Sequence, residues 1–179
     1  MSATEIIQFW FEESRPKQRF SKDPEFDDLI RARFAEAHQL AQRGLLYTWR
    51  DHPLDSLAEV IVLDQFSRSL YRESPLAFAS DALALVLAQE AIRKKFDSEL
   101  EADEKAFLYM PFMHSESAHN HEIAMTLFDQ PGLKDYFNSA RRHKEIIDRF
   151  GRYPHRNKIL GRESTEEELK FLSQPGSSF

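Results

Sequence analysis

The residues 150–157 combine two arginines, a histidine and an asparagine with a glycine and a proline. The side chains that could do chemistry there are Arg152, His155, Arg156 and Asn157. Guanidinium groups bind carboxylates and phosphates through paired hydrogen bonds. Glycine and proline end a helix and hold the following backbone in a defined direction. This stretch therefore predicts a rigid corner that binds an anion.

A purely electrostatic interpretation of this corner stays open. The pattern predicts a helix over residues 133–150 that Gly151 ends, and the basic side chains follow directly. Cations beyond a helix C-terminus gain about 0.3–1 kcal/mol each from the helix dipole. On the same predicted helix, His143 falls on the apolar stripe, so we expect it to face the core, close enough to contribute to the site.

Asp64 and Arg68 lie four residues apart within an otherwise apolar helical pattern. Leu57, Val60 and Ile61 share their side of the predicted helix, and apolar residues also occupy the opposite side. A helix that is apolar on two faces is expected in the centre of the fold. A structural ion pair is the first interpretation. Because a buried pair barely offsets its desolvation, however, this pair also predicts a third partner or a ligand.

His114 and Glu116 form a third polar group. Pro111 is expected to break the preceding helix, and Ser115 is expected to cap the next one, which would place both side chains at a helix N-terminus. Anions bind readily there. If the protein catalyses a reaction, His114 or His155 is the expected acid or base, because histidine titrates near neutral pH. The sequence identifies no other catalytic residue, and a core histidine at a helix end is the alternative.

His119, His121 and Glu122 add to the impression of a metal site. Zinc-binding helices place two histidines one turn apart with a glutamate between them. Here Met125 stands where the second histidine would be. We therefore predict no metal site, and no other cofactor motif is present.

The bulk composition excludes several classes of function. The chain has 179 residues, a net charge of −6 and no cysteine, so disulfides and thiolate chemistry are excluded. The acidic balance argues against nucleic acid or membrane as the main partner. Residues 141–162 hold eight basic against two acidic residues, and 97–122 hold seven acidic against one basic. We expect these two segments to attract each other. The N-terminus lacks a secretory pattern, and the longest apolar run, 82–88, is too short for a membrane span, so a cytoplasmic protein is expected.

Helical signals dominate the chain, and they predict an all-α fold of about seven or eight packed helices in antiparallel hairpins. Asp23-Pro24 is an expected helix start and Gly44 an expected stop. Ser164 with Glu167 is expected to form the capping box of a short last helix. The predicted helices cover residues 4–13, 24–43, 55–72, 75–96, 102–109, 115–129, 133–150 and 165–172. We expect one domain over residues 1–172 and a loose tail over 173–179. A 34-residue repeat is not evident, so any tetratricopeptide character would be degenerate.

At these polar motifs the chain resembles a bacterial family known only as a domain of unknown function, with a tetratricopeptide-like helical fold. The resemblance rests on VLDQFSRSLYR (62–72), FLYMPFMHSE (107–116) and RFGRYPHRN (149–157), and on residues 7–11, 160–162 and 164–172. It covers nearly the whole chain and implies the helical-hairpin fold, but no activity. His119 and His121 depart from the family pattern, which further weakens a metal site.

Three functions remain open. The first is binding of a small anionic ligand, a carboxylate or phosphate, in a pocket formed by the three polar motifs. The residues expected to line it are Asp64, Arg68, His114, Glu116, His143, Arg152, His155, Arg156 and Asn157. The second is a tetratricopeptide-like interaction module that binds an acidic peptide or a partner protein. The third is that the polar clusters are purely structural. RNA binding ranks last, and the sequence does not determine the oligomeric state.

Overall fold

The computed structural model describes residues 2–178, and over that range the chain forms helices and turns without a β-strand. The all-α prediction is confirmed. The α-helices are α1 (Ala3–Gln8), α2 (Pro16–Phe20), α3 (Pro24–Gln42), α4 (Pro53–Ile61), α5 (Ser67–Leu70), α6 (Asp81–Arg93), α7 (Ala102–His114), α8 (Ala118–Phe128), α9 (Lys134–Phe150) and α10 (Glu166–Leu172). Short 3₁₀ turns, such as Pro154–Arg156, connect several of them.

A central rod runs through α4, the π-helical turn Val62–Phe66 and α5. All five residues of the π-helical turn are buried, which a surface helix with a single apolar stripe could not achieve. The rod packs against α1, α3, α6 and α7. The sequence prediction of a central helix around Asp64 is therefore confirmed. Insertions of this π-helical kind occur often at functional sites.

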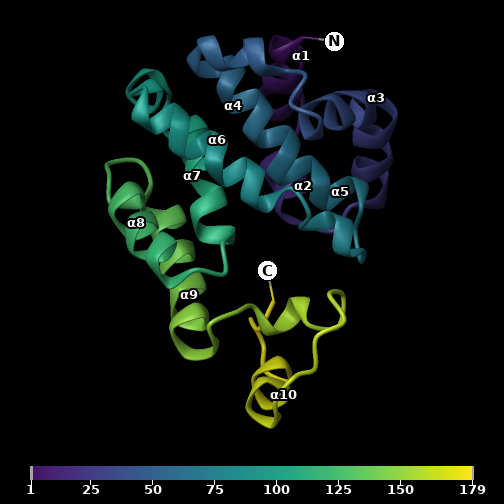
Figure 1. Cartoon of the computed structure of the whole chain (residues 1–179), viewed down its shortest axis with the longest axis vertical. Helices are drawn as coiled ribbons and strands as arrows, with labels where there is room; N and C mark the ends of the chain where they lie inside the picture. Colours follow the sequence, from purple (N-terminus) through teal and green to yellow (C-terminus); the bar gives the residue numbers. More distant parts are fainter. Residues whose placement is uncertain (1, 179) are drawn as a thin grey trace.

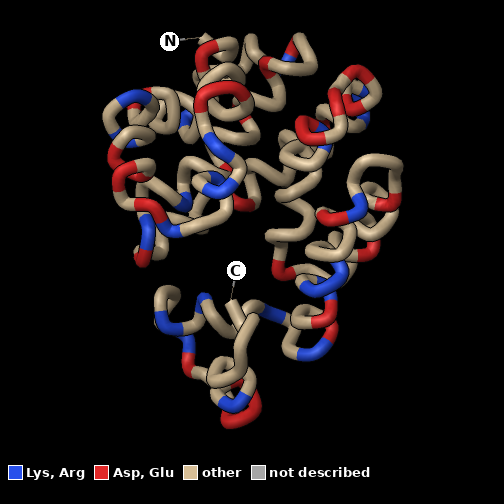
Figure 2. Tube along the Cα trace, turned by 180° about the vertical axis from the view of Figure 1, so that it is seen from behind, with Lys and Arg blue, Asp and Glu red and all other residues tan. Residues whose placement is uncertain are grey.

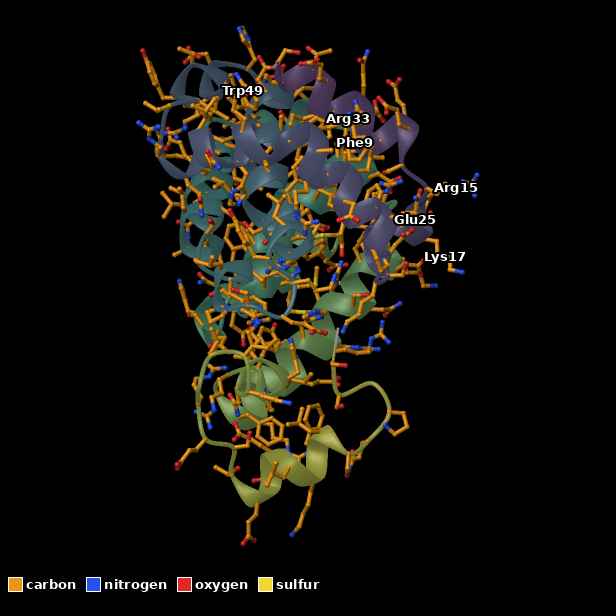
Figure 3. All side chains as sticks on the ribbon, turned by 90° about the vertical axis from the view of Figure 1, so that its right-hand side faces the viewer. Phe9, Arg15, Lys17, Glu25, Arg33 and Trp49 are labelled. Atoms are coloured by element: carbon orange, nitrogen blue, oxygen red, sulfur yellow. The ribbon has the colours of Figure 1, made fainter. Side chains whose placement is uncertain are left out.

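Aromatic side chains fill the core around this rod. The Phe66 ring lies 5.2 Å from the Phe34 ring and 5.6 Å from the Trp10 ring, and Phe9 lies 4.8 Å from Phe34. The Arg33 guanidinium covers the outer side of this group, 4.7 Å from the Phe9 ring centre; both residues are labelled in Figure 3. Burial of large rings supplies most of the driving force for folding in a core of this size.

The helix α1 lies at one end of the long axis of the molecule and α10 at the other, and α8 and α9 lie between the N-terminal helices and α10 (Figure 1). The helix α7 packs against α6 and α8, and α8 packs against α9. Near the C-terminal end of the chain a small second core contains Ile146, Ile147 and Tyr153, with Phe150 and Phe171 packed against it. The segment after α9 therefore has its own apolar anchor on that helix.

Several helix boundaries differ from the sequence prediction. The helix predicted from residue 75 begins only at Asp81, and the helix that Ser115 was expected to cap begins at Ala118 after Ser117. Pro111 does not break α7, which continues to His114. Residues 106–113 are all buried, and their packing outweighs the one backbone hydrogen bond that proline removes. The last helix is capped one residue later than expected, because Thr165 and Glu168 form the capping box. By contrast, Asp23 caps α3 as predicted, accepting a hydrogen bond from the Phe26 amide at 3.1 Å.

Within residues 2–178, the stretch Pro75–Arg93 is the one segment long and apolar enough to cross a membrane by length and composition. Its mean hydropathy is 1.4. In the structure a 3₁₀ turn, Pro75–Ala77, and further turns precede α6. The helix α6 itself packs against α4 and α7. Core helices pass the same test, so the segment is weak evidence for a membrane.

Candidate functional site

Asp64 is the buried centre of the polar groups. Its side chain is 0% exposed, and its carboxylate accepts hydrogen bonds from Gln65 Nε2 at 2.6 Å and from His114 Nδ1 at 2.8 Å. Arg68 lies 3.2 Å from the same carboxylate. Burial by itself raises the pKa of Asp64, but the positive charge of Arg68 and the contact with His114 outweigh it and hold the pKa below its usual value. Asp64 is therefore a carboxylate, and it holds the proton of His114 on Nδ1.

Arg68 has the third partner that the sequence predicted. Its guanidinium donates to Oδ1 and Oδ2 of Asp81 at 3.1 and 3.2 Å and also to the Asp64 carbonyl. Asp81 is the first residue of α6 and was not among the predicted site residues. An acidic residue at that position is normally explained by the helix dipole, so the sequence carried no specific signal for its role.

Arg156 reaches the same carboxylate from the other side. Its guanidinium donates to Asp81 Oδ2 at 3.2 Å and to the His114 carbonyl at 3.0 Å. It lies between two rings, 4.4 Å from the centre of Phe78 and 4.7 Å from that of Tyr153. Its side chain is 8% exposed, and burial lowers its pKa, although Asp81 opposes this. Within the described chain, its Nε atom is buried without a hydrogen-bond partner.

The structure thus brings parts of all three motifs into contact around one acidic residue from α6. We refer to Asp64, Arg68, Asp81, His114 and Arg156 as the polar cluster. It joins the rod, α6, the end of α7 and the turn that follows α9. Two arginines and two aspartates balance each other in charge, so protonation of His114 or the departure of one carboxylate would leave the polar cluster positive.

Tyr153 adjoins the polar cluster and is surrounded by histidine rings. Its ring centre lies 5.5 Å from His155, 5.8 Å from His143 and 6.2 Å from His121. Its hydroxyl donates to the Met113 carbonyl. Burial lowers the pKa of His143 to about 3 and that of His155 to about 4. Both imidazoles are therefore neutral at neutral pH, and Nδ1 of His143 donates to the Ser139 carbonyl at 2.8 Å.

The remaining predicted residues fasten the C-terminal segment. Arg152 forms a bidentate pair with Glu168 at 2.7 and 2.9 Å. Glu116 accepts both a bidentate contact from Arg162, at 2.6 and 2.8 Å, and the Tyr153 amide at 2.7 Å.

Asn157 is fully buried, accepts from Arg162 at 2.9 Å and donates to Ser164 Oγ at 3.0 Å. These contacts lock the backbone on both sides of Arg156, and they tie up the side chains of Arg152, Glu116 and Asn157. Arg162 and Glu168, which complete the contacts, were not predicted, because a sequence does not show which charged residues pair.

One expectation about His114 is wrong. Because α7 continues through Pro111, His114 is the last residue of that helix, and the next helix begins only at Ala118. Its environment is therefore a helix C-terminus rather than an N-terminal anion site. Its position is set instead by Asp64, fifty residues earlier in the chain.

The neighbouring histidines are also not arranged as a metal site. His121 is buried and lies 2.9 Å from the Ser115 carbonyl, to which its Nε2 donates, whereas His119 is exposed. Over residues 2–178, the structure contains no group of three or more histidine, aspartate or glutamate side chains placed to hold a metal ion.

The two oppositely charged segments contact each other. Lys144 lies 2.8 Å from Glu122, and Arg162 pairs with Glu116. Figure 2 shows acidic and basic residues interspersed along the whole trace rather than separated into two faces. Much of the positive charge of residues 141–162 is thus neutralised by acidic residues of the same fold. The arginines of the polar cluster are therefore the better candidates for binding an external anion.

The polar cluster offers guanidinium hydrogen-bond donors and an imidazole nitrogen with a lone pair. Since the Nδ1 proton of His114 is directed at Asp64, its Nε2 carries the lone pair that can accept a proton. The structure gives this Nε2 no hydrogen-bond partner within residues 2–178, and the side chain is 15% exposed. The Arg68 side chain is 22% exposed. Both side chains are therefore partly exposed to solvent.

Comparisons with known proteins agree on the family and leave the activity open. Residues 6–176 match the family model described as "bacterial protein of unknown function (DUF924)". A solved structure of a protein of unknown function from Agrobacterium tumefaciens is 40% identical to the chain, with 96% of each chain covered and a TM-score of 0.91. No curated protein matches. The resemblance inferred from the motifs is confirmed.

Proposed function

The chain belongs to DUF924, a bacterial family of unknown function, and we propose that its polar cluster binds a small carboxylate or phosphate. In this proposal Arg156 and Arg68 hold the anion, and His114 exchanges a proton or a hydrogen bond with it. We further propose that the protein does so in the cytoplasm, in keeping with its lack of cysteine.

The observation that supports this proposal most strongly is the state of Arg156. The side chain is more than nine-tenths buried, yet among residues 2–178 its one carboxylate partner is shared with Arg68. A guanidinium has five N–H donors, and the hydrogen bonds to Asp81 and the His114 carbonyl occupy two of them. Buried donors without partners are unfavourable, and an anion would supply both charge and acceptors.

The energetics also favour a functional interpretation over a purely structural one. Replacing buried ion pairs with well-packed apolar residues is often neutral or stabilising. A network of two arginines, two aspartates and a histidine is therefore a poor means of stabilising a core that is otherwise rich in aromatic rings. Such networks with shifted pKa values are concentrated at functional sites.

The test is isothermal titration calorimetry with inorganic phosphate and with malonate at low salt. The variant Arg156→Met keeps much of the side-chain length and removes the charge. A charge-assisted hydrogen bond contributes about 1.5–3 kcal/mol, so the variant is expected to bind about 10- to 100-fold more weakly. The matched control is Arg93→Met, because Arg93 is 71% exposed and pairs with Glu90 on its own helix.

The result decides between the proposals. Equal affinities in wild type and Arg156→Met, or no heat of binding for either anion with folded wild type, would refute the assignment. An acidic peptide is the second candidate ligand, because its terminal carboxylate is the same functional group that malonate carries twice. Binding of a peptide with a free C-terminus but not of its amidated form, in the absence of malonate binding, would favour the peptide.

A further inference from the structure

Asp81 occupies the position that an anion would take between the two arginines. Its Oδ1 accepts from Arg68, and its Oδ2 accepts from both Arg68 and Arg156. A carboxylate held between two guanidinium groups is the arrangement expected for a bound carboxylate or phosphate ligand. In the free protein this place is filled by the chain itself.

The contacts of Asp81 with arginine are longer than those in four bidentate arginine–carboxylate pairs elsewhere in the protein, and they match the 3.2 Å between Asp64 and Arg68. All three measure 3.1–3.2 Å. The bidentate pairs of Arg50, Arg72, Arg152 and Arg162 measure 2.6–2.9 Å, the normal range for charge-assisted hydrogen bonds. Asp81 is therefore held less tightly than the carboxylates of those four pairs.

Both arginines also have contacts that do not involve Asp81. Arg68 also donates to the Asp64 carbonyl and pairs with the Asp64 carboxylate. Arg156 also donates to the His114 carbonyl and is stacked between two rings. The receptor for the anion is thus preorganised by contacts that do not involve Asp81, and preorganisation reduces the loss of freedom on binding.

Asp81 can leave without unfolding the helix that bears it. The helix α6 is anchored by Ala84, Leu87, Ala88 and Ala91, which lie one to three turns further along. The Asp81 side chain itself is 15% exposed, so a change of rotamer can carry it toward solvent. Exchange of its carboxylate for a singly charged external anion leaves the net charge of the polar cluster unchanged, and a dianion makes it more negative.

We propose that Asp81 is an internal stand-in for the ligand and that the anion enters by displacing it from Arg68 and Arg156. This inference rests on the proposed function and adds how the site is regulated: the chain's own carboxylate competes with the ligand. The site therefore selects anions that bridge two guanidinium groups more tightly than one aspartate does.

The experiment is a titration with inorganic phosphate at constant ionic strength, using wild type, Asp81→Asn and Asp81→Glu. Asp81→Asn retains the size of the side chain and removes the competing charge, so its dissociation constant is expected to fall by about tenfold or more. Asp81→Glu keeps the charge and is expected to bind no more tightly than wild type. Asp27→Asn is the matched control, because Asp27 is also a buried carboxylate that pairs with an arginine. This variant is expected to bind phosphate with the affinity of wild type.

The outcomes separate the two proposals. If wild type binds phosphate and folded Asp81→Asn binds it equally or more weakly, Asp81 positions the arginines and the displacement is refuted, while the anion site stands. If no variant binds phosphate, both proposals fail. Should Asp81→Asn not fold, the carboxyl ¹³C resonance of Asp81 in wild type decides: a shift on phosphate addition supports displacement, and an unchanged resonance in a protein that binds phosphate overturns it.

Discussion

Acid is expected to destabilise this protein through histidines that are buried in their neutral form. Burial lowers the pKa of His38 to about 4, that of His143 to about 3 and that of His155 to about 4, from the ordinary histidine value of 6.5. Below pH 6.5 the unfolded chain takes up protons that the folded chain does not. The folded state therefore has its full stability with respect to these histidines above pH 6.5. It loses stability as the pH falls from 6.5 toward the pKa values of the folded protein.

The reason is clearest at His38, which is fully buried. Ser67 Oγ donates its proton to the Leu63 carbonyl, so His38 Nε2, 2.7 Å away, must be the donor of that pair. Among the described residues, no group accepts a hydrogen bond from Nδ1 of His38. Protonation would add a buried charge and a donor without a partner, both of which are unfavourable.

The magnitude follows from the pKa differences. About 1.5 pH units below the unfolded pKa, at about pH 5, each histidine lowers the free energy of unfolding by about 2 kcal/mol, and three lower it by about 6 kcal/mol. Typical domains are stable by about 5–15 kcal/mol. Hydrogen bonding to Arg152 lowers the pKa of Glu168 to about 2, so its contribution is lost only at more acidic pH.

The assay is urea denaturation at pH 7 and pH 5, comparing wild type, His38→Gln and His119→Gln. Glutamine at position 38 keeps a donor for Ser67 and removes the titration, so this variant is expected to lose about 2 kcal/mol less than wild type between the two pH values. His119 is exposed and serves as the control. A wild-type stability that is equal at both pH values, or a loss in His38→Gln that matches wild type, would refute the reasoning.

Two further predictions concern the polar cluster and its support. Asp64→Ala leaves Arg68 and His114 without their buried counter-charge and is expected to lower the free energy of unfolding by about 3–5 kcal/mol. The control Asp28→Ala, at an exposed pair, is expected to change it by less than about 1 kcal/mol. If thermal denaturation gives similar losses of stability for the two variants, the buried network is contradicted. Tyr153→Phe removes the hydroxyl that donates to a buried carbonyl and is expected to cost about 1–3 kcal/mol, measured by urea denaturation; an unchanged midpoint would mean that the hydrogen bond contributes nothing.

The local helix signals were predictable because capping is a matter of neighbouring residues. Asp23 and Pro24 begin α3, and Gly44 follows its end with a φ of 68°. Gly151, with a φ of 67°, ends α9 in the same left-handed conformation that glycine adopts most readily. Pro111 shows the limit of such rules, since burial of the surrounding turns of α7 outweighs a local breaker.

The pairing of charges was not predictable. With 24 basic and 30 acidic residues, the sequence offers many partners for each arginine. The convergence of Arg68, His114 and Arg156 was a hypothesis drawn from their motifs, and the fold brings them together. Asp81, which links two of them, comes from a helix start that resembles any other, 75 residues away from Arg156.

By itself, therefore, the sequence determined an all-α chain, its family and the place of Asp64 and Arg68 in a central helix, because periodicity, capping and motif order are properties of neighbouring residues. Only the tertiary structure decided that Arg152, Glu116 and Asn157 fasten the C-terminal segment, while Arg156 turns inward to share Asp81 with Arg68. The physical reason is that each arginine pairs with the carboxylate that packing brings within reach, and packing is settled by the aromatic core as a whole.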